Sequence, residues 1–193
     1  MVYNYFTGDY HADSFIMFDY LSDLELVTGN DRSGRKFFNK KQQSQSTKFG
    51  YTWRKRRGDF DREYCPLRKL YKTKLNEDNP ALLKIFEEYR DIYFNSFEFS
   101  EVTINKMVIG TNIKMHLDKV NVGDSVLVAF GNYTGGKTLI QNKDDSNFIV
   151  KDARDEPIIF NGSQRKHSVT TINSGLRYSL VFYKNRYKEI DEY

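Results

Sequence analysis

The sequence contains a single cysteine, Cys65, among its 193 residues. One thiol cannot form a disulfide within the chain, and proteins without disulfides are typical of reducing compartments. We therefore expect an intracellular location: the cytoplasm, the nucleus, or a host cell if the protein is viral.

Long apolar runs are also missing. No stretch of about 18 consecutive apolar residues occurs, so the sequence predicts no membrane span. The residues up to Asp13 are polar and aromatic, without the basic start and apolar stretch of a secretory signal. The length suits one domain with a hydrophobic core, and we expect a single domain over residues 1–193.

The charge is distributed unevenly along the chain. Between Arg35 and Lys74 there are 14 Lys/Arg and 3 acidic residues, a net charge of +11, whereas the remaining 16 basic and 23 acidic residues give −7. A block of this kind favours a polyanionic partner, because neutralising phosphates releases condensed counterions. Aromatic side chains that can stack on unpaired bases are interleaved with the cations: Phe37, Phe38, Phe49, Tyr51, Trp53, Phe60, Tyr64 and Tyr71. The alternative is a solvated basic face with these aromatics in the core.

The pattern of apolar residues and turns predicts helices first and strands later. Asn79 as N-cap and Pro80 as first helical residue predict an amphipathic helix that ends near Asn95, and the polar stretch Asn39–Lys48 suggests a mobile loop. Short β-branched and aromatic segments separated by turns follow at 102–104, 126–130, 138–140, 158–160, 168–172 and 178–183. We predict an α+β, mainly β fold of sandwich or jelly-roll type. Residues 1–96 form a basic, helical N-terminal part, 97–183 a β core, and 184–193 a tail.

Two of the three histidines stand in a pattern that suggests a metal site. His116 and Asp118 are two residues apart at a strand or its end, so both side chains are expected on one face, and His167 follows 49 residues after Asp118. Two imidazoles and one carboxylate match the facial triad of non-haem Fe(II) oxygenases, which leaves positions open for a cosubstrate and dioxygen. The alternative is that they are ordinary surface or core histidines. The third, His11, is expected at the surface.

A second candidate site lies ten residues beyond His167. Arg177 and Ser179 share one face of an otherwise apolar predicted strand. A buried Arg needs a partner, and its planar fork fits a carboxylate in bidentate fashion. The distal carboxylate of 2-oxoglutarate would provide one, with Ser179 adding a hydroxyl. The alternative is a structural pair between Arg177 and an acidic residue.

Two longer stretches form a more specific pattern. One is His116-x-Asp118-x-x-Asn121, then Ser125, then Gly131-Asn132-Tyr133-Thr134-Gly135-Gly136-x-x-Leu139. The other is Phe160-Asn161-Gly162, His167-Ser168-Val169 and Gly175-x-Arg177-Tyr178-Ser179-Leu180-Val181-Phe182. From about Phe97 to Tyr183 the chain resembles the 2-oxoglutarate oxygenase domain of the TET and J-binding-protein superfamily, in particular its small viral, algal and fungal members. The resemblance implies a double-stranded β-helix, or cupin-like jelly roll.

The resemblance also implies an activity and further site residues. Similar enzymes use Fe(II), 2-oxoglutarate and dioxygen to oxidise a substrate C–H bond, releasing succinate and carbon dioxide, and ascorbate stimulates some of them. Asn105 matches an Asn that contacts 2-oxoglutarate in AlkB-type relatives, and Asn121 the position from which TET enzymes contact the target base. Alternatively, Asn105 makes a hydrogen bond at the end of a strand, and Asn121 is a turn-forming residue. Val120 replaces a second base-contacting His, and the Cys-rich zinc region is absent, which puts specificity for methylcytosine in doubt.

The basic block and the resemblance together favour nucleic acid, DNA first, as substrate. The expected target is a pyrimidine 5-methyl group, in 5-methylcytosine or thymine, flipped into the pocket. We expect Arg54, Lys55, Arg56 and Arg57 to contact phosphates. The rival is a prolyl or lysyl hydroxylase on the same fold, although prolyl 4-hydroxylases usually hold the cosubstrate with Lys where this chain has Arg177. A small-molecule oxygenase and a non-catalytic nucleic-acid-binding module are further alternatives.

Overall fold

The computed structural model describes residues 5–24, 26, 44–52, 71–143 and 147–185. The described part contains helices α1 (Tyr10–Asp23), α2 (Lys74–Asp78) and α3 (Leu82–Tyr93). Its strands are β1 (Gln45–Thr52), β2 (Tyr71–Lys72), β3 (Glu101–Met107), β4 (Ile113–His116), β5 (Asn121–Phe130), β6 (Thr134–Gly135), β7 (Thr138–Gln141), β8 (Phe148–Lys151), β9 (Ile158–Phe160), β10 (His167–Val169), β11 (Ile172–Ser174) and β12 (Arg177–Asn185). No helix in these described ranges is both long and apolar enough to cross a membrane.

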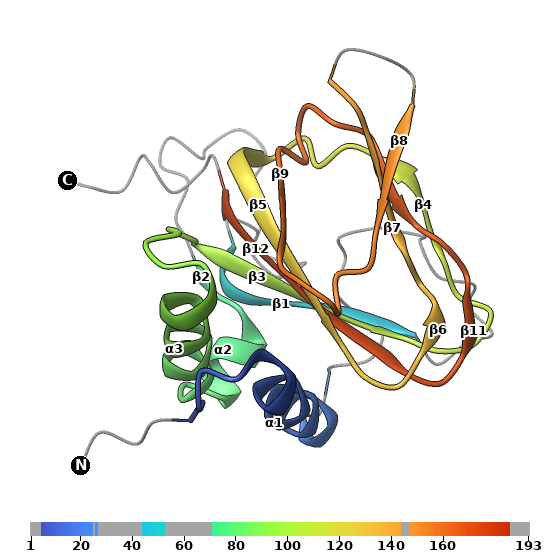
Figure 1. Cartoon of the computed structure of the whole chain (residues 1–193). Helices are drawn as coiled ribbons and strands as arrows, with labels where there is room; N and C mark the ends of the chain where they lie inside the picture. Colours follow the sequence, from blue (N-terminus) through green and yellow to red (C-terminus); the bar gives the residue numbers. More distant parts are fainter. Residues whose placement is uncertain (1–4, 25, 27–43, 53–70, 144–146, 186–193) are drawn as a thin grey trace, which may run out of the picture.

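Two antiparallel sheets form the body of the molecule (Figure 1). The larger has the strand order β2-β1-β3-β12-β5-β9, and the smaller β4-β10-β7-β8, with a two-stranded β11-β6 pair beside them. Neighbouring strands are mostly not consecutive in the chain, so the connections cross from one sheet to the other, as in a jelly roll. The predicted mainly β, jelly-roll fold with an N-terminal helix is confirmed.

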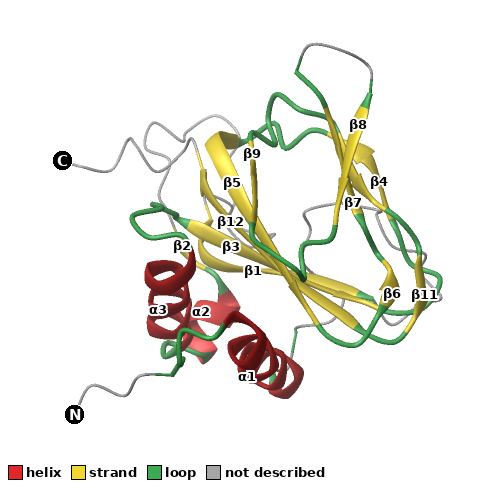
Figure 2. Ribbon diagram, in the orientation of Figure 1, coloured by secondary structure: helices red, strands yellow, loops and turns green. Residues whose placement is uncertain are grey.

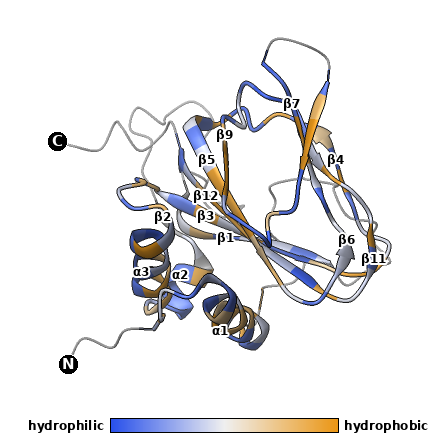
Figure 3. Cartoon of the chain, viewed as in Figure 1, coloured by the Kyte–Doolittle hydropathy of each residue, from blue (hydrophilic) through white to orange (hydrophobic). Residues whose placement is uncertain are grey.

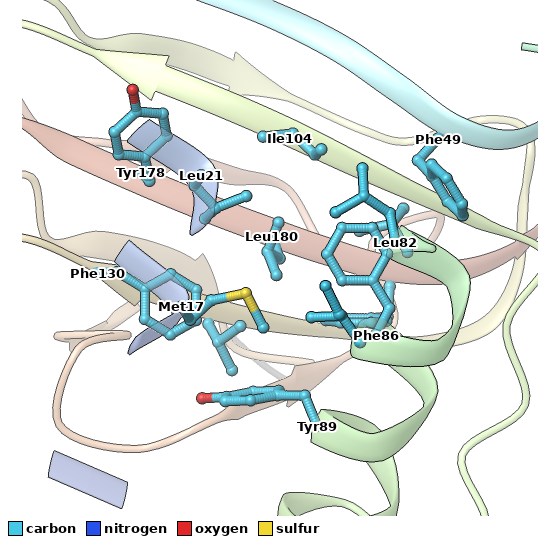
Figure 4. Packing of buried hydrophobic residues seen from close by; sticks show 14 of the residues in the cluster. Met17, Leu21, Phe49, Leu82, Phe86, Tyr89, Ile104, Phe130, Tyr178 and Leu180 are labelled. Atoms are coloured by element: carbon cyan, nitrogen blue, oxygen red, sulfur yellow. The ribbon is translucent and has the colours of Figure 1, made fainter. Parts of the chain in front are cut away.

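The helices cover one face of the larger sheet (Figure 2). Helix α3 buries Leu82, Ile85, Phe86 and Tyr89, which recur at helical spacing. The helix also carries hydrophilic residues, so it is amphipathic (Figure 3). Every second residue of the central strands faces the helices, and Figure 4 shows this packing of Met17, Leu21, Phe49, Leu82, Phe86, Tyr89, Ile104, Phe130, Tyr178 and Leu180. These side chains form the main core.

The alternate residues of the same strands face the smaller sheet. Leu127, Ala129, Ile158 and Phe160 pack with residues of β7, β10 and β11 in a second buried cluster. Strand β12 shows the alternation best, because Tyr178, Leu180 and Phe182 join the helix-facing core while Ser179, Val181 and Tyr183 line a cavity between the sheets. The sheet therefore separates an apolar packing face from a partly polar cavity.

Three local predictions were wrong. The predicted amphipathic helix is present as α3 and ends at Tyr93, but it begins at Leu82 and Asn79 does not cap it. Asn79 is the C-cap of α2, with its backbone N–H and side-chain amide donating to Leu75 O. The end of the predicted loop, Gln45–Lys48, belongs to β1. The expected strand 168–172 is divided between β10 and β11, because the chain changes partners from β7 to β6.

Candidate metal centre

His116 and His167 lie side by side on neighbouring strands. His116 is the last residue of β4 and is paired in register with His167, the first residue of β10. Paired residues of an antiparallel ladder point to the same face, and the two imidazole centroids are 4.2 Å apart. The ladder thus brings together two histidines 51 positions apart in the chain.

Asp118 completes the group from a turn. The strand ends at His116, so the expected alternation along one strand does not place Asp118; its backbone N–H donates instead to Gly162 O at 2.8 Å. Asp118 Oδ1 lies 3.7 Å from His116 Nε2, and Oδ2 lies 3.3 Å from His167 Nε2. One ligand atom from each of the three residues lies within 4.8 Å of the others. The expected triad is therefore assembled.

Backbone carbonyls orient both imidazoles. His116 Nδ1 is 2.7 Å from Lys114 O, and His167 Nδ1 is 3.0 Å from Arg165 O. A carbonyl oxygen only accepts, so each neutral ring carries its proton on Nδ1 and presents the lone pair of Nε2 to Asp118. Phe160 packs edge-on against the His167 ring at 4.8 Å and further fixes its position.

These donor atoms fit a divalent iron ion. Two imidazole lone pairs and a carboxylate oxygen that face one another repel in the absence of a cation, and an ion between them turns this repulsion into attraction. Two nitrogen ligands and one oxygen ligand on one side of the ion are the set used by non-haem Fe(II) sites. The outer hydrogen bonds to Lys114 O and Arg165 O are the orienting interactions that metal-bound histidines usually have.

Arg177 is fully buried without a carboxylate partner among the described residues. Its side chain is 0% exposed, its Nη1 donates to Met107 Sδ at 3.5 Å, and its Nε and Nη2 have no hydrogen-bond partner there. The guanidinium carbon lies 5.6 Å from the Tyr133 ring centroid. Burial lowers the pKa of Arg177, and nearby Tyr133 and Asp152 oppose this shift. Leaving such a charge unpaired is costly, so the group is suited to an anionic ligand.

Arg177 begins β12, a strand that forms part of the wall of the cavity that contains the metal ligands. It shares a strand face with Ser179, Val181 and Tyr183, which line the cavity, while Arg177 itself is not part of the wall. The cavity wall also includes Thr138, whose fully buried hydroxyl has no hydrogen-bond partner in the described structure. A ligand oxygen in the cavity could accept a hydrogen bond from this hydroxyl.

Three polar residues on neighbouring strands line this cavity. Ser46, Asn105 and Ser179 are paired across β1, β3 and β12. Ser46 Oγ donates to Asn105 Oδ1 at 2.8 Å, and Asn105 Nδ2 donates to Ser179 Oγ at 3.4 Å. Two of these residues were predicted to bind the cosubstrate, and all three line the same cavity as the triad.

Several lining residues gave no recognisable sequence signal. Ser46, Thr103, Thr138 and Tyr183 are ordinary strand residues whose position depends on pairing between distant segments. Tyr183 donates to the buried Glu101 carboxylate, which also accepts from Lys48 at 3.1 Å. Only the alternation of polar and apolar residues in β12 could have pointed to Tyr183.

The remaining predicted residues have mixed outcomes. Asn121 lies in the cavity wall and is only 7% exposed. Arg54, Lys55, Arg56 and Arg57 lie outside the described residues, as does most of the basic block. His11 is exposed in the first turn of α1, as expected.

Comparisons with known proteins reveal a shared fold. A scan against protein-family models and a search of curated proteins both find no match. Among solved structures, a prolyl-4-hydroxylase from Pseudomonas putida aligns with a TM-score of 0.51 and 11% identity over 95% of this chain and 90% of that chain. This likeness shows the fold.

Two further solved structures align less closely. A 2OG-Fe(II) oxygenase family member from Burkholderia pseudomallei has a TM-score of 0.41 and 21% identity over 60% of this chain and 58% of that chain. NgTET1 in complex with 5mC DNA has a TM-score of 0.49 and 17% identity over 74% of this chain and 61% of that chain. The chain thus spans less than two thirds of the length of either protein.

Proposed function

We propose that this chain is an Fe(II)- and 2-oxoglutarate-dependent dioxygenase that oxidises a substrate C–H bond. The observation that supports this most is the convergence of His116, Asp118 and His167 on a cavity lined by β12, the strand that also carries the buried Arg177, which has no carboxylate partner among the described residues. A metal site alone would fit many functions. A buried guanidinium without a carboxylate partner among the described residues, on a strand that lines the same cavity, favours a cosubstrate with a second carboxylate.

Each residue has a distinct role in this proposal. His116, Asp118 and His167 hold the iron, which supplies the activation of dioxygen that C–H oxidation requires when 2-oxoglutarate is converted to succinate and carbon dioxide. Arg177 binds the distal carboxylate, assisted by Ser179, and Asn105 orients Ser179 or contacts the cosubstrate directly. The surrounding apolar side chains of Leu127, Phe160 and others exclude water from the reacting centre.

The proposed substrate is a pyrimidine 5-methyl group in nucleic acid, with DNA favoured. The basic block at 35–74 supports this, and so do exposed cations next to the metal ligands: Lys114, Lys119 and Lys166. Between residues 113 and 122 and between 162 and 167 the single acidic residue is Asp118 itself. A cationic surround at the iron favours a phosphodiester backbone over an acidic peptide.

Cosubstrate turnover tests the enzyme class. The purified protein with Fe(II), ascorbate and 2-oxoglutarate should form succinate, and His116→Ala or Asp118→Ala should abolish it, because two ligands hold the ion too weakly. His11→Ala, which removes the exposed histidine of α1, is the control and should retain wild-type turnover. If either ligand variant forms succinate at the wild-type rate, the assignment of His116, Asp118 and His167 as iron ligands is wrong.

Product analysis tests the substrate class. Methylated and unmethylated DNA, and in a parallel reaction a proline- and lysine-containing peptide, are incubated with the complete system and analysed by mass spectrometry. We expect an oxidised pyrimidine nucleoside and an unchanged peptide. Hydroxylation of the peptide alone would replace the nucleic-acid proposal by a prolyl or lysyl hydroxylase on the same fold.

A further inference from the structure

The Asp118 carboxylate is held by the turn in which it stands. Asn121 N–H donates to Asp118 O at 3.0 Å and closes the turn between β4 and β5. The side chain of the same residue reaches back, because Asn121 Nδ2 lies 3.5 Å from Asp118 Oδ2. A carboxylate oxygen only accepts, so the amide group that faces it must be the NH₂.

A second hydrogen bond holds the Asn121 side chain in place. Its Nδ2 also donates to Ser125 Oγ at 3.2 Å, and Ser125 is 0% exposed at the start of the buried part of β5. Asn121 is 7% exposed, so its amide has little freedom to turn toward a molecule in the cavity. The three side chains form a chain from the sheet to the metal ligand.

Gly162 also lies close to the Asp118 carboxylate. A Cβ at Gly162 would lie 3.1 Å from Asp118 Oδ2, tighter than ordinary van der Waals contact, and 3.4 Å from His167 Cε1. A larger residue at position 162 would therefore press on Asp118 Oδ2, the oxygen that faces the Asn121 amide.

We infer that Asn121 is a positioning residue for the iron ligand Asp118, anchored by Ser125, and that base recognition is not its principal task. The inference rests on the proposed metal site and deepens it. Outer hydrogen bonds to a ligating carboxylate set its orientation, and their loss typically weakens metal binding by about 10–100-fold. A residue whose task was to contact the substrate base would leave metal affinity unchanged.

Co(II) affinity, followed by visible absorption without cosubstrate or substrate, tests the inference. Asn121→Ala should bind Co(II) about 10–100-fold more weakly than wild type. Ser125→Ala, which keeps the amide but removes its anchor, should show a smaller loss in the same direction. The double variant should lose less than the product of the two single losses, because both act through one chain of hydrogen bonds. Should Asn121→Ala not fold, Ser125→Ala and its Co(II) spectrum carry the test.

Asn76→Ala is the matched control. Asn76 lies in α2, on the helix side of the large sheet, is 8% exposed and donates its side-chain amide to Gly50 O. Its replacement should lower thermal stability without changing Co(II) affinity. Wild-type Co(II) affinity in both Asn121→Ala and Ser125→Ala would overturn the inference while leaving the metal site intact. Absence of Co(II) binding by the wild type would overturn the metal site and the inference with it.

Discussion

At the scale of single residues, chemistry could be predicted better than position. The sequence predicted that His116, Asp118 and His167 would converge, and the structure brings them together, while the cosubstrate role of Arg177 stays a prediction. The reason given for Asp118 was wrong, because a turn rather than strand alternation directs it. Thr138 and Ser46 were missed since a single Thr or Ser in a strand has no distinctive signal until its neighbours are known.

Replacement of Arg177 should raise the 2-oxoglutarate requirement. Removing one partner of a buried, hydrogen-bonded charge pair costs about 2–5 kcal/mol, so Arg177→Ala should raise the apparent cosubstrate constant roughly 30-fold or more. Arg177→Lys should recover only part of this, because an ammonium lacks the bidentate fork. Succinate formation as a function of 2-oxoglutarate concentration measures both variants.

Arg154→Ala is the control for the Arg177 variants. Arg154 lies over the same Tyr133 ring, at 4.6 Å, but is paired with Asp152 at 3.3 Å. Its loss should leave the cosubstrate requirement as in wild type. An unchanged requirement in Arg177→Ala as well would reject the role of Arg177.

At the scale of elements, a helix or strand was predicted wrongly where the role of a polar residue depends on neighbouring segments of the fold. Strand β1 was taken for loop because its polar residues suggested solvent, whereas Ser46 faces the cavity and Phe49 faces the helices. The Asn79-Pro80 pair has the sequence of a helix start, but Asn79 closes α2 before the chain turns into α3. Each sequence pattern is compatible with two local structures, and tertiary packing decides which of the two forms.

The attachment of α1 depends on one buried carboxylate. Asp13 is 0% exposed and accepts hydrogen bonds from Thr7, Gly8 and Tyr93. Burial alone would raise the pKa of Asp13, but these hydrogen bonds outweigh it and hold the pKa below its ordinary value. Ionised Asp13 therefore adds stability above its unfolded-state pKa, which is lost as pH falls through the lower folded-state pKa.

Asp13→Asn should lower the free energy of unfolding by about 1–3 kcal/mol at neutral pH, since a charged acceptor of several hydrogen bonds is removed. The difference from wild type should shrink below about pH 4, where the unfolded-state carboxyl is protonated. Urea denaturation at both pH values measures it. Asp19→Asn, at an exposed position of the same helix, should have little effect at either pH; an equal effect of both variants would show that helix charge alone is responsible.

At the scale of the whole molecule, the fold class followed from the density of short strands, but the partnership of strands did not. His116 and His167 meet because β4 and β10 pair, and nothing local to either strand specifies that pairing. The β12 register, which places Ser179 opposite Asn105, is likewise fixed by packing on both faces of the sheet. Such long-range pairings arise from the shared core, so single-sequence patterns predict them only through family resemblance.

The proposed nucleic-acid substrate predicts that positive charge around the metal site governs the affinity for DNA. Lys119→Glu with Lys166→Glu should weaken duplex binding and lower the slope of log affinity against log salt by about 0.9 for each phosphate that the protein no longer neutralises. Lys84→Glu, an exposed charge on α3 on the opposite side of the large sheet, should bind as wild type does. Binding titrations at several salt concentrations compare them. Equal weakening per substituted lysine in the double variant and in Lys84→Glu would indicate a net-charge effect without a binding face.

The pairing of His116 with His167 affects the stability of the strands that carry them, β4 and β10. An ion held by both, and by Asp118, cross-links segments 49 residues apart along the chain, and it closes a long loop whose freedom would otherwise favour the unfolded state. The same cavity is also lined by β12, the strand that carries Arg177. Ion and dicarboxylate therefore stabilise one shared arrangement of strands, so that binding of either should tighten binding of the other by an equal factor.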